Sequence, residues 1–150
     1  MVSRRPAGRF AFAVQKAALV VGAVFVIAGL LGFVPGITVG YDTMAVFGHQ
    51  SGALLLGIFN VSILHNVVHL LFGVIGIAAA LRFAAARAYL IIGGISYLLL
   101  FVYGLLIDHH SAANFVPLNN ADDWLHLSIG VGMALLGVLL GRSAPPTSAH

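Results

Sequence analysis

The sequence predicts an all-α integral membrane protein in which four transmembrane helices form a bundle. The 150 residues are 61% hydrophobic and only 7% charged, and the mean hydropathy is +1.07. Soluble domains carry about a quarter charged residues. Seven basic and four acidic side chains cannot coat a water-facing surface of this size. The lipid bilayer is therefore the expected surrounding of the chain.

Four apolar stretches approach the ~20 residues needed to cross a bilayer. They run roughly over residues 17–34, 62–81, 88–107 and 124–140. The first stretch is interpreted as a retained helix, because no small-residue cleavage site of a signal peptide follows it. Short connections predict antiparallel neighbours. The expected domain plan is a basic segment over 1–16, a transmembrane domain over 17–141 and a disordered tail over 142–150.

The charged residues predict the orientation of the chain. The basic residues all precede the first span, follow the fourth or lie between the second and third: Arg4, Arg5, Arg9, Lys16, Arg82, Arg87 and Arg142. All four aspartates fall on the other side. The positive-inside rule then predicts that both termini of this multi-pass protein lie on the cytoplasmic side of a bacterial cytoplasmic membrane. The basic residues are too dispersed for a nucleic-acid site, and the absence of cysteine excludes disulfides and thiolate metal sites.

Between the first two spans lies a further apolar patch, residues 53–59. One continuous helix over residues 52–81 would be ~45 Å long and would exceed the bilayer core. We therefore expect a short interfacial helix at this patch. Asn60 or Ser62 is expected to cap the second span, and Asn120 and Asp123 the fourth.

The second and fourth spans share a pattern of polar and small residues. The second contains H-x3-H-x3-G over residues 65–73, and the fourth contains D-x3-H-x3-G over residues 122–130. Asn66 and Asp123 occupy corresponding positions. Residues spaced by four share one face of a helix. A repeat of two helical hairpins would place a pseudo-twofold axis along the membrane normal, but chance convergence remains an alternative.

The polar residues of this pattern are expected at one depth, in the outer half of the membrane. His65 lies ~25 Å and His126 ~24 Å from the cytoplasmic arginines, and His69 lies one turn deeper. Ionisable side chains inside a membrane are costly and mark functional sites. The core of the candidate site consists of His65, His69, Asp122 and His126. Asn66 and Asp123 are expected to support these residues from the second coordination shell.

Three interpretations of this cluster stay open. In the first, the polar side chains only hydrogen-bond helices together, at ~0.6 kcal/mol per contact, in an accessory or scaffold subunit of a membrane complex. In the second, the four core residues bind zinc or iron, and haem between two facing histidines is the less favoured form. In the third, the histidines serve a proton-coupled transporter or a lipid- or quinone-binding subunit.

No enzymatic motif accompanies the cluster: phosphate loop, dinucleotide fingerprint and nucleophile elbow are all missing from the sequence. A binding role is therefore favoured over catalysis. A bundle this small leaves open a homo-oligomer or a partner protein in a membrane complex.

Three segments carry a resemblance to a known family. They are GFVPGIT at residues 32–38, LHNVVHLLFG at 64–73 and NFVPLNNADDWLHL at 114–127. Together they resemble a family of small four-span bacterial membrane proteins, frequent in actinobacteria and catalogued only as a domain of unknown function. The resemblance extends over residues 9–141 and implies the four helices and a bacterial host, but no activity. The family pattern often has Asn at the position of Asp123, which makes Asp122 the better candidate ligand.

Overall fold

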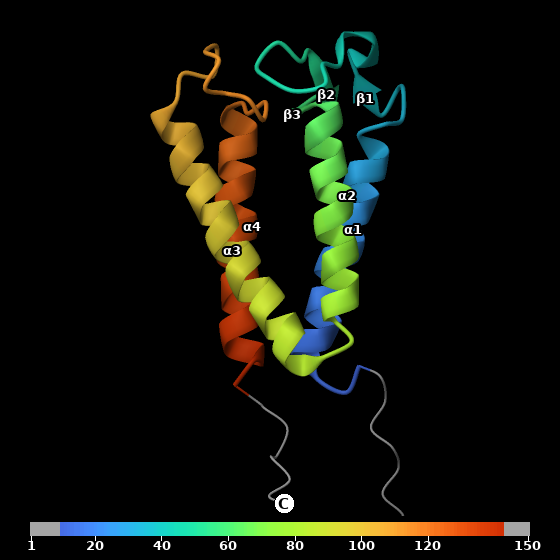
Figure 1. Cartoon of the computed structure of the whole chain (residues 1–150), viewed down its shortest axis with the longest axis vertical. Coiled ribbons are helices and arrows are strands. Elements are labelled where there is room, and N and C mark those ends of the chain that lie inside the picture. The colour runs from blue at the N-terminus through green and yellow to red at the C-terminus, as the bar shows by residue number, and fades with distance from the viewer. Residues whose placement is uncertain (1–9, 143–150) are drawn as a thin grey trace, which may run out of the picture.

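The computed structural model describes residues 10–142 and contains four helices and a small sheet (Figure 1). The helices are α1 (Ala13–Leu31), α2 (Ile63–Ala79), α3 (Phe83–Leu106) and α4 (Asn120–Leu140). They pair as two antiparallel hairpins, α1 with α2 and α3 with α4, which approach each other at one end and diverge toward the other (Figure 1). Packing within each hairpin is far more extensive than packing between the hairpins.

Three of the helices are long and apolar enough to cross a membrane: α1 with 19 residues, α3 with 24 and α4 with 21. Helix α2 is apolar but has 17 residues, which is the lower end of the range observed for transmembrane helices. The predicted four helices are thus confirmed. Helices α3 and α4 begin several residues before the apolar stretches do, because each helix includes charged residues that bound its apolar stretch, Arg87 in α3 and Asp122 and Asp123 in α4.

The segment between α1 and α2 forms a three-stranded antiparallel sheet of order β1-β2-β3. The strands are β1 (Thr38–Val39), β2 (Ala53–Leu55) and β3 (Phe59–Val61), and a 3-10 turn, η1 (Tyr41–Thr43), follows β1. The expectation of an interfacial helix over residues 53–59 is therefore wrong, because this segment forms β2, a turn and the start of β3. Leu56 and Gly57 both have positive φ, 57° and 71°, a conformation that suits a tight hairpin turn and interrupts a helix.

The starts of α2 and α4 are capped by side chains. The Oγ of Ser62 accepts a hydrogen bond from the backbone N–H of His65 at 3.1 Å, which confirms one of the two caps expected for α2. The cap of α4 is Asn119, whose Oδ1 accepts from the N–H groups of Ala121 and Asp122 at 2.8 and 3.1 Å. The expectation of Asn120 and Asp123 is corrected, because both residues already lie inside the helix.

Glycines allow the helices of each hairpin to come close together. A Cβ added at Gly73 of α2 would lie 2.6 Å from the carbonyl oxygen of Gly22 in α1. A Cβ added at Gly94 of α3 would lie 2.8 Å from the carbonyl oxygen of Gly130 in α4. Small residues at such crossings let two backbones approach, which is how helices associate in membranes.

At the diverging end of each hairpin, a polar side chain of one helix lies against a glycine of the other. The side chain of Asn66 lies against Gly32 at the end of α1, and the side chain of Asp123 lies against Gly104 of α3. Gly32 follows Gly22 by ten residues, as Gly104 follows Gly94. The repeat seen in the sequences of α2 and α4 thus extends to α1 and α3, which favours duplication of a hairpin over chance convergence.

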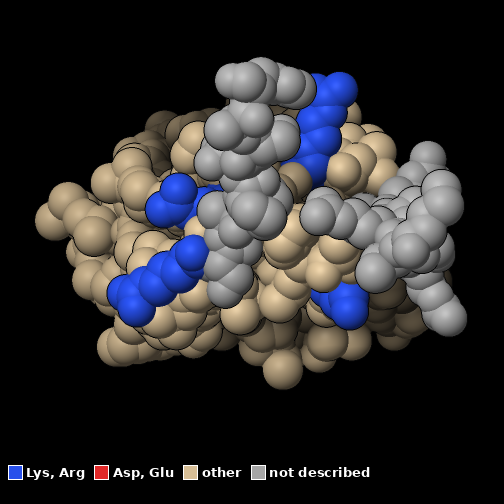
Figure 2. All heavy atoms as spheres, turned by 90° about the horizontal axis from the view of Figure 1, so that it is seen from below, with Lys and Arg blue, Asp and Glu red and all other residues tan. Residues whose placement is uncertain are grey.

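Charge is segregated along the helix axes. Figure 2 shows Lys and Arg side chains at the end where the hairpins converge, and no acidic side chain among the described atoms in that view. The aspartates lie at the diverging end, in η1, after α3 and in the first turn of α4. Residues 1–9 and 143–150 lie outside the described residues, so the predicted disorder of the tail is untested.

Candidate functional site

The six residues proposed for the site fall into two groups in the structure. One group fastens helix ends and connecting segments at the diverging end: Asp122, Asn66 and Asp123. The other group consists of imidazoles that lie between the two hairpins: His65, His69 and His126.

Asp122 links α4 to the sheet. Its side chain is 2% exposed, and its Oδ2 accepts hydrogen bonds from the N–H groups of Asn119 and Asn60 at 2.9 and 3.0 Å. Asn60 belongs to β3. The Nδ2 of Asn119 also donates to the carbonyl of Ile58 at 2.9 Å. This carboxylate therefore closes the capping box of α4 and ties the two hairpins together at their diverging end.

Asn66 and Asp123 each face the end of their own hairpin. The Nδ2 of Asn66 contacts the sulfur of Met44 at 3.9 Å. The Oδ2 of Asp123 lies 3.2 Å from Nε2 of His109, in the loop after α3. Within the described chain, neither side chain hydrogen-bonds to a histidine of the second group. His109 is a partner that the sequence did not indicate, because loop contacts leave no periodic pattern.

The three histidines belong to an aromatic cluster that joins all four helices. The ring centroids of His65 and His69 on α2 are 4.4 Å apart and nearly perpendicular, at 79°. His126 on α4 lies near enough to interact electrostatically with both. Its ring is 5.2 Å from that of Tyr97 on α3, and the ring of His69 is 5.4 Å from that of Phe25 on α1. Tyr97 and Phe25 themselves lie 5.4 Å apart, which closes the cluster.

The two aromatic–histidine pairs are equivalent in the repeat. Phe25 follows Gly22 by three residues, as Tyr97 follows Gly94. Aromatic residues in a membrane helix are most often packing or interfacial residues, so the residue type of Tyr97 does not distinguish it in the sequence. The signal that could have identified the pair was the common spacing from a glycine.

Each of the three histidines has a buried nitrogen without a hydrogen-bond partner. His65 and His126 are 6% and 5% exposed, and the Nδ1 atoms of these two and of His69 are unpaired. The remaining nitrogen of His65 donates to the backbone carbonyl of Pro117. A buried polar atom left unpaired costs about 1–3 kcal/mol. Three of them in one cluster point to a role other than fastening helices.

A pocket of about 130 Å³ adjoins two of these histidines. Its walls come from α2, α3, α4 and the loop before α4, and are formed by His65, Val68, Leu100, Val116, Leu118 and His126. An apolar cavity of about 150 Å³ accommodates benzene, so this pocket suits a single ring.

The four residues predicted as metal ligands do not form one coordination shell. Across residues 10–142, no group of three or more His, Cys, Asp or Glu side chains is arranged to hold a metal ion. Asp122 is engaged with β3 and the cap of α4. The imidazoles alone would suit zinc or iron chemically, and metal or haem binding by them stays a prediction.

Comparison with known proteins assigns the chain to a family. The model of a domain of unknown function, DUF4383, matches residues 15–139. The chain therefore belongs to this family, and the match extends over the four helices, the sheet and both groups of polar residues. No curated protein and no solved structure matches the chain.

Proposed function

We propose that this member of the DUF4383 family spans a bacterial cytoplasmic membrane four times, with both termini in the cytoplasm. The apolar length of α1, α3 and α4 supports three spans. Helix α2 runs antiparallel to α1 over the same depth (Figure 1), and its 17 residues suffice for a fourth span. The gathering of Lys and Arg at the converging end (Figure 2) supports the orientation, because cytoplasmic segments carry the excess of basic residues.

Its function, in this proposal, is to bind a small membrane-soluble molecule that has a flat ring and hydrogen-bonding oxygens, such as a quinone. The observation that carries the proposal is the set of unpaired imidazole nitrogens beside a ring-sized apolar pocket. The ring would lie among Val68, Leu100 and Leu118. The imidazole N–H of His126 would donate to a carbonyl oxygen on the ring, whereas the N–H of His65 is already used by the carbonyl of Pro117. The role is binding, and no covalent chemistry is assigned to the site.

The other members of the cluster support the two pocket histidines. The Tyr97 ring packs against His126, and the perpendicular His69 ring packs against His65. Packing of this kind restricts the imidazoles to few orientations, so binding needs little additional ordering of side chains.

Titration with duroquinone, a single-ring quinone without a long tail, tests the proposal. The full chain, purified in detergent without a histidine tag, is titrated by isothermal calorimetry. Replacement of the donor, His126→Phe, is expected to weaken binding about tenfold, since it removes one hydrogen bond in a dry site. His110→Phe, in the exposed loop after α3, is the matched control and keeps the wild-type affinity. No binding by the wild type, or wild-type affinity in His126→Phe, contradicts the proposal.

Metal binding by the histidines alone is a second candidate. It is favoured by the close rings of His65 and His69, one turn apart on α2, with His126 facing them from α4. His69 does not line the pocket, so His69→Phe separates the two candidates. Elemental analysis would find near-stoichiometric zinc or iron in the wild type and none in this variant if the metal candidate holds. Duroquinone binding that survives His69→Phe, without metal in either protein, supports the quinone site.

A further inference from the structure

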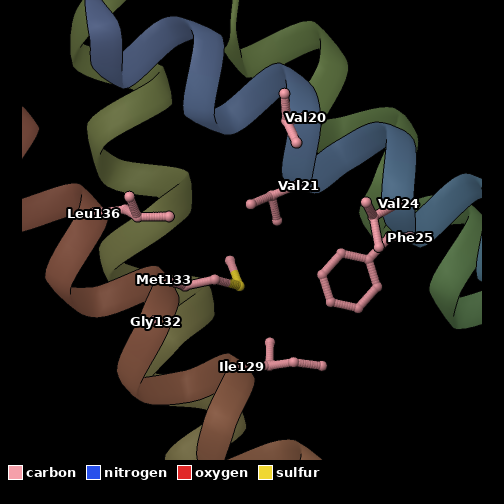
Figure 3. Close-up of a pocket in the computed structure, with 8 residues that line it drawn as sticks. All are labelled: Val20, Val21, Val24, Phe25, Ile129, Gly132, Met133 and Leu136. Atoms are coloured by element: carbon pink, nitrogen blue, oxygen red, sulfur yellow. The ribbon is translucent and has the colours of Figure 1, made fainter.

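A second apolar groove lies between α1 and α4, nearer the basic end (Figure 3). Its volume is about 230 Å³, and it is lined by Val20, Val21, Val24, Phe25, Ile129, Gly132, Met133 and Leu136. Figure 3 shows the α1 side chains on one wall and the α4 side chains on the other. A Cβ added at Gly132 would meet no atom within 4 Å, so this part of the groove is empty space within the described structure.

The groove is closed on its inner side and open to the membrane. Phe25 and Met133 are buried and form the floor, whereas Val20 and Val24 on the rim are 62% and 58% exposed. At the end toward the histidine cluster, the Phe25 ring packs against His69 and Tyr97. The opposite end points to the basic end of the molecule. A long apolar group would therefore enter from that side.

A basic side chain stands at the open end. Lys16 of α1 is exposed, and Val20 and Val24 follow it at intervals of four residues, on the same helix face. Val20 lies ~6 Å and Val24 ~12 Å further along the axis. Lys16 forms no ion pair with any residue among 10–142, where the one ion pair is that of His109 with Asp123. A free ammonium group here attracts phosphate, and no aspartate of the chain lies at this end to compete.

We infer that this groove binds one acyl chain of an anionic phospholipid, whose phosphate lies against Lys16 at the cytoplasmic surface. The inference rests on the membrane placement proposed above, but not on the histidine site. The groove supplies an apolar trough between two hairpins, and Lys16 supplies the charge that selects an anionic headgroup. The lipid would fill the gap between α1 and α4, where the two hairpins have few direct contacts.

Native mass spectrometry of the full chain in detergent tests this inference. The protein is titrated with phosphatidylglycerol and with phosphatidylcholine of identical chains. The wild type is expected to prefer phosphatidylglycerol about fivefold, the effect of one lysine near an anionic lipid. Lys16→Gln removes this preference, and Gly132→Phe, whose Cβ meets no atom within 4 Å and whose ring occupies the groove, abolishes retention of both lipids.

Matched controls come from the opposite side of the bundle. Ala88 lines a different apolar groove, which lies between α2 and α3. Arg82 is exposed at the same basic end as Lys16. Ala88→Phe and Arg82→Gln are expected to bind lipid as the wild type does. Should Gly132→Phe fail to fold by circular dichroism, Val20→Trp, on the exposed rim, blocks the groove instead.

Three results would overturn the inference. Equal lipid retention by a folded groove variant would show that the chain does not occupy the groove. An equal loss of preference in Arg82→Gln would show general attraction to the basic end. A lipid-free dimer that Gly132→Phe dissociates would identify the groove as an interface between two copies. Duroquinone binding measured on the same variants reports on the histidine site separately.

Discussion

Single polar side chains in this protein differ in whether their hydrogen-bonding atoms are already used. The Oδ2 of Asp122 accepts two backbone hydrogen bonds, whereas the Nδ1 of His126 accepts or donates none. Because little water reaches the interior of a membrane protein, an unused atom has no other partner. The two backbone hydrogen bonds of Asp122 hold the fold, whereas the free nitrogen of His126 is available to a bound molecule.

The hydrogen bonds of the Asp122 side chain are expected to stabilise the fold. Asp122→Ala removes a charged acceptor from two N–H groups and should lower the free energy of unfolding by about 2 kcal/mol. The melting temperature in detergent, followed by circular dichroism, should fall by about 5 °C. Asp108→Ala is the control, because the Asp108 side chain is exposed and accepts only from the backbone N–H of His110 in its own loop. Equal melting of the two variants would refute the fastening role of Asp122.

The sequence contained part of this distinction. Asn119 followed three residues later by an acidic residue is the pattern of a capping box, and it could have assigned Asp122 to the helix start. The height of Asp122 near His126 instead suggested a common site. The side chain of Asp122 is directed toward Asn60 and Asn119, and the depth of a residue in the membrane does not predict the direction of its side chain.

At the scale of helices, each hairpin depends on glycines that face a partner backbone. Gly73 contacts Gly22 so closely that even a methyl group would overlap it. Gly132, on α4, faces open space. The two glycines lie in similar apolar sequences, so the fold alone distinguishes them.

A matched pair of alanine substitutions tests this account. Gly73→Ala should destabilise the protein by about 1–3 kcal/mol, because the added Cβ forces α1 and α2 apart. Gly132→Ala should be neutral or should stabilise by up to about 1 kcal/mol, since alanine is the better helix former. Unfolding in detergent with increasing dodecyl sulfate measures both. A similar loss of unfolding free energy in the two variants would mean that the close helix contact at Gly73 does not determine stability.

The elements were predictable to different degrees for a physical reason. A membrane-spanning helix is specified by length and apolar composition alone, and all four helices followed from these properties. The seven-residue patch over 53–59 is too short for periodicity to separate helix from strand. Gly57 indicated a turn. The positive φ of Leu56 could not be predicted, because leucine rarely adopts this conformation.

At the scale of the whole molecule, two similar hairpins enclose a site that neither forms alone. The sequence showed the repeat in α2 and α4, where identical glycines and histidines recur. It concealed the repeat in α1 and α3, where Phe25 in one copy matches Tyr97 in the other. The pocket beside His65 and His126 has walls from both hairpins, so it could not be derived from either hairpin separately.

The orientation of the whole molecule is directly testable, because the chain has no cysteine. Ala112→Cys places a thiol in the exposed loop after α3, and Arg82→Cys places one between α2 and α3. A membrane-impermeant maleimide should label Ala112→Cys in spheroplasts and Arg82→Cys only after permeabilisation, as the positive-inside rule requires. The reverse pattern would invert the proposed topology.

The most direct test of the central claim is to identify what the protein carries from the membrane. The wild type, His126→Phe and His110→Phe are purified from bacterial membranes in mild detergent, and bound small molecules are extracted and quantified by mass spectrometry. The account predicts about one ring-bearing, lipid-soluble molecule per chain in the wild type and in His110→Phe, and its loss in His126→Phe. The same molecule at the same ratio in His126→Phe, or none in the wild type, would contradict it.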